Sequence, residues 1–517
     1  CAYKNRFEGH FLMTLPLLSL IIFLPLSGVF FLTLIRRKDE RNAKVVGLWI
    51  ALINFFLSII LWIKFDPFNF EYQFVEKYEW FKGINVSYYL GIDGLSLYFI
   101  ILTTLLIPLC MLFSWNNIQK RVREYMMVFL LLETLVLGSF CALDLILFYM
   151  FFEGTLIPLF LIIGVWGGEE RIHACFKFFL YTLLGSVFML LVIAKLYSEF
   201  GTTDLTVLID QKFSFSLEAW VWLGFFIAMA VKIPMWPFHT WLPYAHVEAP
   251  TAGSVLLAGI LLKLGGYGFA RIVIPMLPDA STYFAPYVMA LSIVAIFYTS
   301  FIALVQKDMK KLIAYSSIAH MGFVTLGLFS LNLQGTAGAI LLMLSHGLIA
   351  SALFLMIGML YERFHTRDIK AYGGLYKSFP ILAGLFLVFT FASIAVPGTG
   401  SFIGEFFILY GTFQANTVFA TLALVGVILG PAYALWLYQR LFNGKLVVPL
   451  NDSPIEANEI RSLHKSTPDL TYLERFILCS LLIGIFVIGI YPKLFTNVIN
   501  RSVRSKVLIH HHLVHND

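Results

Sequence analysis

Long apolar stretches fill most of this chain, and short polar segments separate them. A run of about twenty apolar residues is long enough to cross a bilayer as an α-helix. Runs of that length predict fourteen membrane-spanning helices, at 12–35, 46–64, 90–114, 124–142, 143–165, 174–197, 218–245, 251–275, 283–305, 312–330, 336–360, 379–412, 418–440 and 472–495. The first run can span and lacks a clear cleavage site, so we expect a membrane helix there and no signal peptide.

Lysine and arginine gather in the loops that follow odd-numbered helices. These loops contain Arg36–Lys44, Lys120–Arg123, Lys307–Lys311, Arg363–Lys377 and the long polar segment Gln439–Thr471. Loops after even-numbered helices carry few basic residues, and in segment 65–89 acidic residues balance the two lysines. By the positive-inside rule, the basic loops face the cytoplasm or matrix, and both termini face the other side. The basic tail from Arg501 runs against this rule.

We expect two of the predicted spans to be broken helices. The run 218–245 holds Pro234 and Pro237, and the run 379–412 holds Pro397 and Gly398. Proline removes a helix hydrogen bond, and a broken membrane helix is tolerated only where protein or a water-filled cavity satisfies the freed groups. Each broken helix is the fourth of a block of five, and an odd number of helices inverts the second block. We therefore expect two inverted repeats, a common plan in transporters.

The predicted fold is an all-α polytopic membrane protein in four parts. Helices 1–3 occupy residues 1–123, the first repeat (helices 4–8) 124–275, the second (helices 9–13) 276–441, and the polar loop, helix 14 and tail 442–517. The composition agrees, since 59% of the residues are hydrophobic and 13% charged, against about 25% charged in soluble domains. The net charge of +6 lies in the short loops, which is a topology signal and does not indicate nucleic-acid binding.

Six ionisable side chains inside the predicted spans are the main candidates for a proton path, since a charge there costs about 2.5–3.5 kcal/mol. They are Glu153, Lys232, Lys263, His320, His346 and Glu405. Buried carboxylates and lysines change their proton affinity readily, and histidine titrates near neutral pH, so this set can carry protons. The alternative is structural: static ion pairs or capped turns for the acids and lysines, and helix packing for the histidines.

Other polar residues are weaker candidates for a proton path. Glu133 lies in an apolar run, where packing or pairing is as good an explanation as a role in transport. We expect His239, His246 and Glu248 to shape the end of the seventh helix, with a role in proton uptake left open. We expect Asp308 to be a solvated loop charge.

The sequence contains no motif for a nucleotide, metal or iron–sulfur cluster. It has no Walker A motif, and its nearest match to GxGxxG lies inside a membrane run. The five cysteines are scattered singly, without metal or redox spacing. We expect the histidines at 510–512 and His515 to belong to a flexible tail. No cofactor or metal site is therefore predicted in this chain.

Six segments are specific enough to compare with known families. They are YYLGIDGLSLYFIILTTLLIPLC (88–110), LFYMFFEGTLIPLFLIIGVWGG (147–168), AVKIPMWPFHTWLPYAHVEAPTAGSVLLAGILLKLGGYG (230–268), IAYSSIAHMG (313–322), LLMLSHGL (341–348) and PGTGSFIGEF (397–406). These segments resemble the antiporter-like subunit 4 family of the proton-pumping NADH:ubiquinone oxidoreductase, respiratory complex I. The resemblance covers about residues 12–440 and implies fourteen helices with two inverted five-helix blocks, in agreement with the loops.

The resemblance also implies a proton relay at the membrane midplane. Its members are Glu153 of the fifth helix, Lys232 of the seventh helix as its partner, Lys263 of the eighth helix, His320, His346 and Glu405 of the twelfth helix. Closely related subunits carry a lysine at the last position, so an acid there favours subunit 4. The departures, Trp236, Phe238 and the polar segment after residue 440, bear on partner contacts and not on the relay.

The resemblance implies that the chain is a membrane-arm subunit of an H⁺-translocating NADH:ubiquinone reductase and performs no redox chemistry itself. Protons are expected to enter near Glu153 and Lys232, pass Lys263, His320 and His346, and leave near Glu405. NADH, FMN, iron–sulfur clusters and ubiquinone are then expected in partner subunits. The expected partners are neighbouring antiporter-like subunits, accessory subunits and membrane lipids, with cardiolipin as a candidate. The expected location is the mitochondrial inner membrane, with the bacterial plasma membrane as the alternative.

Two other functions fit the same buried charges. One is a subunit of a multi-subunit cation/proton antiporter with no redox partner. The wording of YYLGIDGLS and PGTGSFIGEF favours the respiratory subunit over this antiporter. The other is a scaffold in which the ion pairs only hold helices together.

Overall fold

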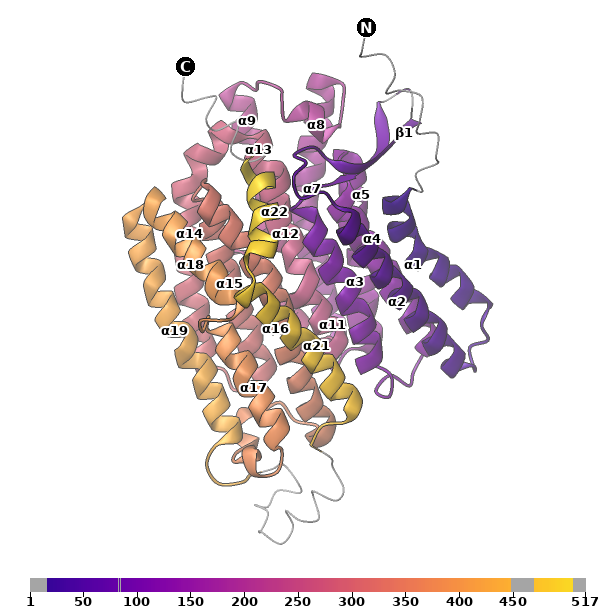
Figure 1. The fold of residues 1–517 in the computed structure, drawn as a ribbon, viewed down its shortest axis with the longest axis vertical. Helices are drawn as coiled ribbons and strands as arrows, with labels where there is room; N and C mark the ends of the chain where they lie inside the picture. The colour runs from indigo at the N-terminus through magenta and orange to yellow at the C-terminus, as the bar shows by residue number, and fades with distance from the viewer. Residues whose placement is uncertain (1–15, 82, 84, 448–468, 505–517) are drawn as a thin grey trace.

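A computed structural model describes residues 16–81, 83, 85–447 and 469–504 of the chain (Figure 1). The described helices make fourteen crossings, which confirms the predicted all-α polytopic fold. Twelve of the crossings are long and apolar enough to span a membrane as they stand. The other two are α15 (Met309–Leu328), which is more polar, and the broken pair α17 (Pro380–Ser393) and α18 (Gly400–Ala415). The predictions for 12–15, for most of the polar segment and for the histidine-containing tail lie outside the described residues.

The chain runs back and forth through the bundle, and several crossings consist of two or more helices in line. The first seven are α1 (Leu17–Leu34), α2 (Glu40–Lys64), α3 (Ser96–Phe113), α4 (Val122–Cys141), α5 (Leu145–Gly154) with α6 (Leu156–Trp166), α7 (Arg171–Phe200), and α9 (Phe215–Lys232) with α10 (Trp241–Glu248). The eighth combines α11 (Thr251–Leu256), α12 (Leu262–Gly268) and α13 (Ile274–Met276) with two π-helical turns, η2 (Leu257–Leu261) and η3 (Phe269–Val273). The remaining ones include α14 (Pro278–Val305), α16 (Leu333–Phe364), α19 (Thr417–Phe442) and α21 (Tyr472–Ile490).

Short elements connect these crossings at the two faces. They are α8 (Leu205–Leu208), η4 (Ile369–Ala371), η5 (Leu375–Lys377) and α22 (Lys493–Val503). The helix α22 buries Val498, Ile499 and Val503 and leaves its polar side outward. The predicted helix 14 runs to residue 495, but α21 ends at Ile490 and the chain turns there into α22. Pro492, which cannot donate a helix hydrogen bond, lies at this turn.

The basic loops lie together at one face of the molecule. Lys44, after the first crossing, donates to the carbonyl of Trp115, after the third, at 2.6 Å. Arg367, after the eleventh crossing, lies 3.4 Å from Asp308, after the ninth. We call this the basic face. Its grouping of Lys and Arg is the pattern on which the positive-inside prediction rests.

The opposite face carries a β-hairpin that the sequence analysis missed. Strands β1 (Gln73–Phe81) and β2 (Val86–Ile92) pair antiparallel, with Tyr78 opposite Tyr88. The prediction of a loop over 65–89 and a helix from 90 was therefore wrong. The strands are rich in aromatic and β-branched residues, which favour a pleated surface, and α3 begins only at Ser96. We call this side the hairpin face.

Both predicted helix breaks occur, and a third was missed. The chain leaves helical structure between α9 and α10 and again between α17 and α18. Gly398 in the second break has φ +95°, a conformation that only glycine adopts without strain. The fifth crossing, predicted as one helix, is interrupted at Thr155 between α5 and α6. Pro158 explains this interruption because it has no N–H to donate to the carbonyl of Gly154.

One backbone motif occurs at both faces in opposite orientation. Isolated β-bridges join Asp144 to Asp204 and Asp308 to Asp368, with the same spacing between the paired aspartates. In each case the first aspartate also caps a helix, α5 or α15. The first bridge lies at the hairpin face, where Lys77 of β1 contacts Asp204, and the second lies at the basic face. An inverted repeat produces this arrangement; the repeat boundaries of 124–275 and 276–441 stay a prediction.

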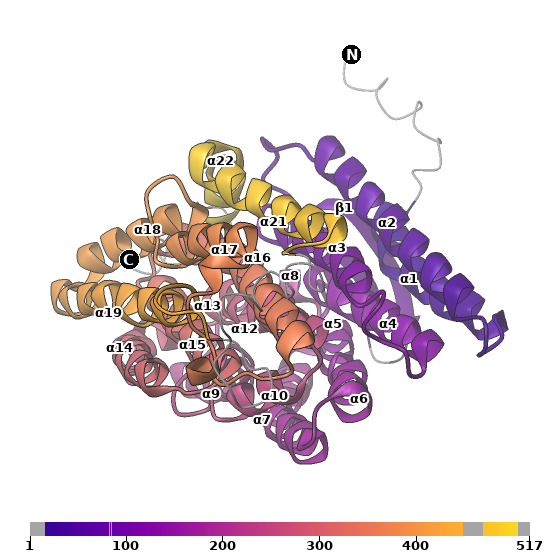
Figure 2. The same ribbon diagram turned by 90° about the horizontal axis from the view of Figure 1, so that it is seen from below.

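Two crossings form the centre of the bundle. The eighth crossing, 251–276, and α16 are buried along their whole apolar windows, whereas only 28% of the α2 and α19 windows is buried. Figure 2 shows α12 near the middle of the bundle, with α1, α7 and α19 at its rim. Side chains on the two central crossings are therefore enclosed by protein, while the rim helices present apolar side chains to lipid or to partners.

Candidate functional site

Lys263 lies at the centre of the bundle, on α12 directly after the π-helical turn η2. Its side chain is fully buried. Its ammonium group donates to the carbonyl of Ala258 within that turn. Its Nζ also lies 2.8 Å from Nδ1 of His346 on α16. The lysine of the eighth crossing and the histidine of the eleventh thus share a hydrogen bond.

A line of titratable groups continues from this hydrogen bond into the second half of the chain. The ring of His346 lies 5.5 Å, centroid to centroid, from that of His320 on α15. Nδ1 of His320 lies 3.4 Å from a carboxylate oxygen of Glu405 on α18. Four of the six predicted site residues are therefore neighbours, although they come from four different elements.

Two small cavities adjoin this line on either side of His320. One is lined by Ser316, Ser317, His346 and Ser401, the other by Glu405, Ser300 and Tyr433. Each has a volume of about 10 Å³, close to what a single water needs. Hydroxyl-lined space of this size can hold a water that bridges groups too far apart for a direct hydrogen bond.

Glu153 and Lys232 lie apart from this line, at the two helix breaks nearest the rim. Lys232 ends α9, and its Nζ donates to Oγ1 of Thr155 at 3.2 Å and lies 4.4 Å from the centroid of the Phe152 ring. Glu153 faces both Lys232 and Ser186. Its carboxylate oxygens are buried, and neither has a hydrogen-bond partner among the described residues. The predicted Glu153–Lys232 pair is open in this structure, with no ion pair within 4 Å in the described chain.

Helices α9 and α12, which carry the two lysines, pack directly against each other. A Cβ placed on Gly265 of α12 would lie 2.7 Å from the backbone nitrogen of Ile233, so α12 and the end of α9 touch directly. Within the part of the chain that the structure describes, no hydrogen bond joins Lys232 to Lys263. The six predicted residues therefore form two groups: an open pair, Glu153 and Lys232, and a contiguous line of four.

The structure adds two buried bases that the sequence analysis underrated. Lys310 of α15 is 6% exposed and donates to the carbonyl of Ala249 at 2.6 Å. His246 of α10 is fully buried, with its ring stacked on Phe354 at 4.6 Å and no hydrogen bond to either nitrogen from the described residues. His246 lies within electrostatic range of both Lys310 and Lys263. In the sequence, Lys310 is one of several basic residues in a polar loop. The one local signal that sets it apart is its position two residues after Asp308, which caps α15.

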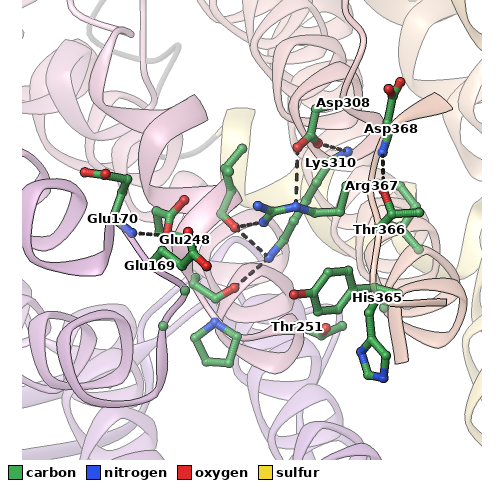
Figure 3. A pocket seen from close by; sticks show the side chains of 18 of the residues that line it. Glu169, Glu170, Glu248, Thr251, Asp308, Lys310, His365, Thr366, Arg367 and Asp368 are labelled. Carbon is green, nitrogen blue, oxygen red and sulfur yellow. Dashed lines mark hydrogen bonds and ion pairs between the residues drawn. The ribbon is translucent and has the colours of Figure 1, made fainter. Parts of the chain in front are cut away.

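A cavity of about 730 Å³ opens beside Lys310 at the basic face (Figure 3). Acidic and basic side chains mix along its wall: Glu169, Glu170, Glu248, Asp308, Lys310 and Arg367. The expectation of a solvated loop charge at Asp308 is wrong, since its carboxylate accepts the backbone N–H groups of Lys310 and Lys311 as the cap of α15. Glu248 accepts the backbone N–H of Glu170 at 3.0 Å, as expected for a residue that shapes the end of α10.

Two further weak candidates lie away from the line of four. Glu133 of α4 is fully buried and accepts a hydrogen bond from Nδ2 of Asn54 at 2.7 Å. His239 lies in the break before α10, with its ring edge-on to Tyr298 at 5.6 Å. Neither is in contact with a member of the line among the contacts that the structure describes. These contacts favour packing and pairing for Glu133 and are compatible with the expected role of His239 in shaping this part of the seventh crossing.

The chemistry available at the site is acid–base chemistry. Among the described residues, no group of three or more His, Cys, Asp or Glu side chains comes together in a way that could hold a metal ion. The buried line consists of an amine, two imidazoles and a carboxylate, each of which can gain and lose a proton. The arrangement can therefore pass protons between the two halves of the chain.

Two family models together match most of the chain. Residues 142–430 match the family described as NADH:quinone oxidoreductase/Mrp antiporter, TM. Residues 19–141 match the family described as NADH-ubiquinone oxidoreductase chain 4, amino terminus. All six predicted site residues, from Glu153 to Glu405, fall within the first of these matches.

Curated relatives match over nearly their full length. NADH-ubiquinone oxidoreductase chain 4 from Arabidopsis thaliana is 50% identical, over 95% of this chain and 97% of its own. NADH-quinone oxidoreductase subunit M from Rhodobacter capsulatus is 49% identical, over 96% of this chain and 97% of its own.

Solved structures share the fold. A chain of respiratory complex I from Thermus thermophilus with bound NADH superposes with a TM-score of 0.82 and 31% identity, over 95% of this chain and 99% of its own. A chain of the Mrp complex from Dietzia sp. DQ12-45-1b superposes with a TM-score of 0.80 at 19% identity, over 95% of this chain and 52% of its own. At that identity the second match shows likeness of fold alone.

Proposed function

The chain belongs to the family of NADH-ubiquinone oxidoreductase chain 4 and NADH-quinone oxidoreductase subunit M, and from this premise we propose that it moves protons along the buried line Lys263–His346–His320–Glu405. As a member of this family it is a proton-translocating membrane-arm subunit of complex I, and so a subunit of an enzyme. The oxidation of NADH and the reduction of quinone take place in other subunits, and this chain responds to them by changing the charge state of its buried groups.

The observation that carries this proposal is the contact between the two halves of the chain at the bundle centre. Lys263 comes from the eighth crossing, whereas His346, His320 and Glu405 come from the second half. The first contact is a hydrogen bond of 2.8 Å, and the last is a charge contact of 3.4 Å. Between them the two imidazoles lie 5.5 Å apart by ring centroid, which is close enough for one water to connect them.

Proton uptake is supported best at the basic face. The cavity in Figure 3 is lined by the buried residue Lys310, and His246 lies within electrostatic range of both Lys310 and Lys263. This route differs from uptake near Glu153 and Lys232, since the side chain of Lys232 donates to Thr155 and that of Lys263 donates to Ala258. We place uptake at the cavity and give His246 the transfer step to Lys263.

Glu153 and Lys232 then do not carry protons themselves. They act on the buried line through the electrostatic effect of their charges on Lys263. Lys232 is a cation at a helix break, held by the hydroxyl of Thr155 and the face of Phe152. When Lys232 turns toward Glu153, the two charges offset each other. When it turns away, as in this structure, its positive charge disfavours a second cation at Lys263, which then passes its proton to His346.

The partners and location follow from the relatives. The relatives from Arabidopsis thaliana and Rhodobacter capsulatus are named as NADH-ubiquinone and NADH-quinone oxidoreductase subunits, so we place NADH, FMN, iron–sulfur clusters and ubiquinone in partner subunits. The apolar rim helices fit neighbouring membrane-arm subunits and lipid. We propose the mitochondrial inner membrane as the location, because the relatives named chain 4 include plant proteins at 50% identity.

The antiporter without a redox partner is supported less well. The Mrp complex from Dietzia shares the fold at 19% identity, whereas relatives named as NADH oxidoreductase subunits reach 50%. Co-purification distinguishes the two, since the complex I subunit should purify with flavin and iron–sulfur absorbance. A stable transporting assembly without that absorbance would favour the antiporter.

The proposed line is tested by Lys263→Met in the intact complex, with Lys120→Met as the matched control at an exposed position. Membranes carrying each variant are supplied with NADH, and acidification is followed with a pH-sensitive dye. We expect Lys263→Met to lose most NADH-driven proton transport while the complex still assembles and reduces an artificial electron acceptor. We expect Lys120→Met to match the parent. Normal transport by an assembled Lys263→Met complex would remove Lys263 from the path.

A further inference from the structure

The helix α7 runs from the basic face to the hairpin face at the rim of the bundle (Figure 2). It begins at the basic face, where Trp166, the last residue of α6, donates through Nε1 to the carbonyl of Lys120 at 2.8 Å. It ends at the hairpin face, where the carbonyl of Gly201 accepts from Nδ2 of Asn85 at 3.2 Å. The outer side of α7 therefore meets the surroundings of the protein at every depth of the membrane.

Lys177 and Lys195 mark the two ends of an apolar outer side on α7. Every exposed residue between them is apolar, and Leu180, Leu184 and Leu191 are 58%, 65% and 60% exposed. The two lysines lie about 27 Å apart along the axis of an α-helix. The hydrocarbon core of a bilayer is roughly 30 Å thick. The outer side of α7 therefore fits one bilayer from end to end.

The outer side of α7 has the composition of a surface that faces lipid. Membrane helices pack against each other through small residues, which let two backbones approach closely. On α7 the small residues Gly185 and Ser186 are buried on the inner side, where a Cβ on Gly185 would lie 3.0 Å from the side chain of Val231 of α9. Long apolar side chains occupy the outer side instead. We therefore expect acyl chains, and not the helix of a neighbouring subunit, against this side.

Three polar side chains gather at the basic-face end of the outer side. Nζ of Lys177 lies 3.7 Å from the centroid of the Tyr244 ring of α10. The ring of His173 meets the same tyrosine edge-on, at 6.0 Å between centroids. Helical side chains lean toward the N-terminus of their helix, so Lys177 extends back toward His173, one turn before it, and toward the basic face. We call these three residues the α7 cluster.

The α7 cluster is positively charged, whereas the charge at the other end of the outer side is neutralised. Among the described residues, no acid forms an ion pair with Lys177 or His173, and none of their side-chain nitrogens has a hydrogen-bond partner. Lys195, in contrast, forms an ion pair with Glu199, one turn later. His173 is exposed and Tyr244 is 46% exposed, so a ligand can reach both. The outer side thus attracts an anion at its basic-face end only.

We propose that the α7 cluster binds the phosphate group of an anionic phospholipid whose acyl chains lie along the outer side of α7. The ammonium group of Lys177, the imidazole N–H of His173 and the hydroxyl of Tyr244 are all hydrogen-bond donors, and phosphate oxygens accept. Basic clusters at the cytoplasmic or matrix side of membrane helices recognise lipid head groups of this charge. A zwitterionic lipid binds less well, because the cation of its head group is repelled by Lys177. The site is separate from the proposed proton path.

The test uses the intact complex in phosphatidylcholine bilayers that contain a small fraction of a photoactivatable lipid. The photoactivatable lipid is phosphatidylglycerol in one sample and phosphatidylcholine in the other, and both carry the same photoreactive acyl chain. After illumination, mass spectrometry measures how much of each lipid is attached to peptides of α7. We expect several-fold more labelling by phosphatidylglycerol. Equal labelling by the two lipids would overturn the proposal. Labelling of other rim helices but not of α7 would show that a neighbouring subunit covers this side, and would overturn it as well.

Substitutions then assign the preference to the α7 cluster. Lys177→Met with His173→Phe removes the donors and keeps side chains of similar size, and we expect the two lipids to label this variant equally. Lys177→Arg keeps the charge and the donors and should keep the preference. Lys195→Met is the matched control, since Lys195 lies on the same helix at the opposite membrane boundary and is paired with Glu199. It should label like the parent. A preference that survives in the assembled Lys177→Met and His173→Phe complex would place the anionic lipid elsewhere and overturn the assignment. If that complex does not assemble, the single variant Lys177→Met decides in the same way.

Discussion

Nζ of Lys263 lies 2.8 Å from Nδ1 of His346, and each atom is a base that can hold one proton. A hydrogen bond between them requires that one nitrogen carry an N–H and that the other accept with its lone pair. If both were charged, they would repel each other across a dry interior, where a like-charge contact is costly. The two halves of the chain therefore meet at one hydrogen bond that holds at most one positive charge, and whatever changes the charge near Lys263 decides on which side that charge rests.

Lys263→Arg should abolish proton transport although it keeps the positive charge. Arginine does not deprotonate in proteins, so it can occupy the site but cannot release a proton to His346. We expect NADH-driven acidification to fall at least about tenfold, within the range for losing a proton-transfer group. Lys120→Arg, at an exposed position, is the control for introducing an arginine into the chain, and it should leave acidification unchanged. Parent-like acidification by an assembled Lys263→Arg complex would show that Lys263 acts only as a fixed charge.

Glu405→Gln should interrupt the far end of the line. Glutamine has nearly the shape of glutamate but cannot take the proton that His320 presents across 3.4 Å. We expect about a tenfold or greater loss of NADH-driven acidification. Glu405→Asp keeps a carboxylate on a shorter side chain and should retain part of the activity. Glu79→Gln, at an exposed position of β1, is the control. Equal activity of the Gln and Asp variants would show that transport does not require a titratable group at this position.

Glu133→Gln should leave proton transport intact, because Glu133 contacts Asn54 and not the line of four. A glutamine oxygen can accept the same hydrogen bond from Nδ2 of Asn54, which is 2.7 Å long in this structure. Asn54→Leu removes the donor and leaves a buried carboxyl group without it, which costs about 1–3 kcal/mol. Thermal unfolding of the purified complex should show the second variant less stable than the first. Loss of acidification in a stable Glu133→Gln complex would place Glu133 on a proton path.

Gly404→Ala should impair assembly, whereas Gly384→Ala should be tolerated. A Cβ on Gly404 of α18 would lie 2.8 Å from the backbone nitrogen of Leu342 on α16, but a Cβ on Gly384 of α17 would meet nothing within 4 Å. Close helix contact through small residues is how membrane helices pack, and overpacking costs about 1–3 kcal/mol. The amount of assembled complex on a native gel measures the difference. Equal amounts for both variants would mean that α16 and α18 separate without penalty.

The crossings and the two large breaks could be predicted because the local sequence decides both. Apolar runs of spanning length set the crossings, and proline or Gly398 sets each break, so local sequence is sufficient. The interruption at Thr155 was equally local, and Pro158 was its signal. The hairpin at 73–92 was missed because its aromatic residues gave no clear alternation, and because pairing between two strands is decided by contacts across the turn.

The residues that belong to the site could be predicted from the sequence, but which of them contact one another could not. Buried charge in an apolar run identifies Lys263, His320, His346 and Glu405 one at a time. Sequence carries no information on distance between crossings, so it could not show that these four touch while Lys232 turns to Thr155 and leaves Glu153 unpaired. Lys310 and His246 were underrated for a related reason, since their burial depends on how α10 and α15 pack.

The hydrogen bond from the N–H of Gly94 to the hydroxyl of Ser502 joins positions separated by 408 residues. The ribosome must therefore synthesise α22 before the surroundings of the buried ion pair between Arg271 and Asp93 are complete. A nascent chain that has not yet reached α22 lacks this contact, so the hairpin-face end of the bundle closes late in synthesis.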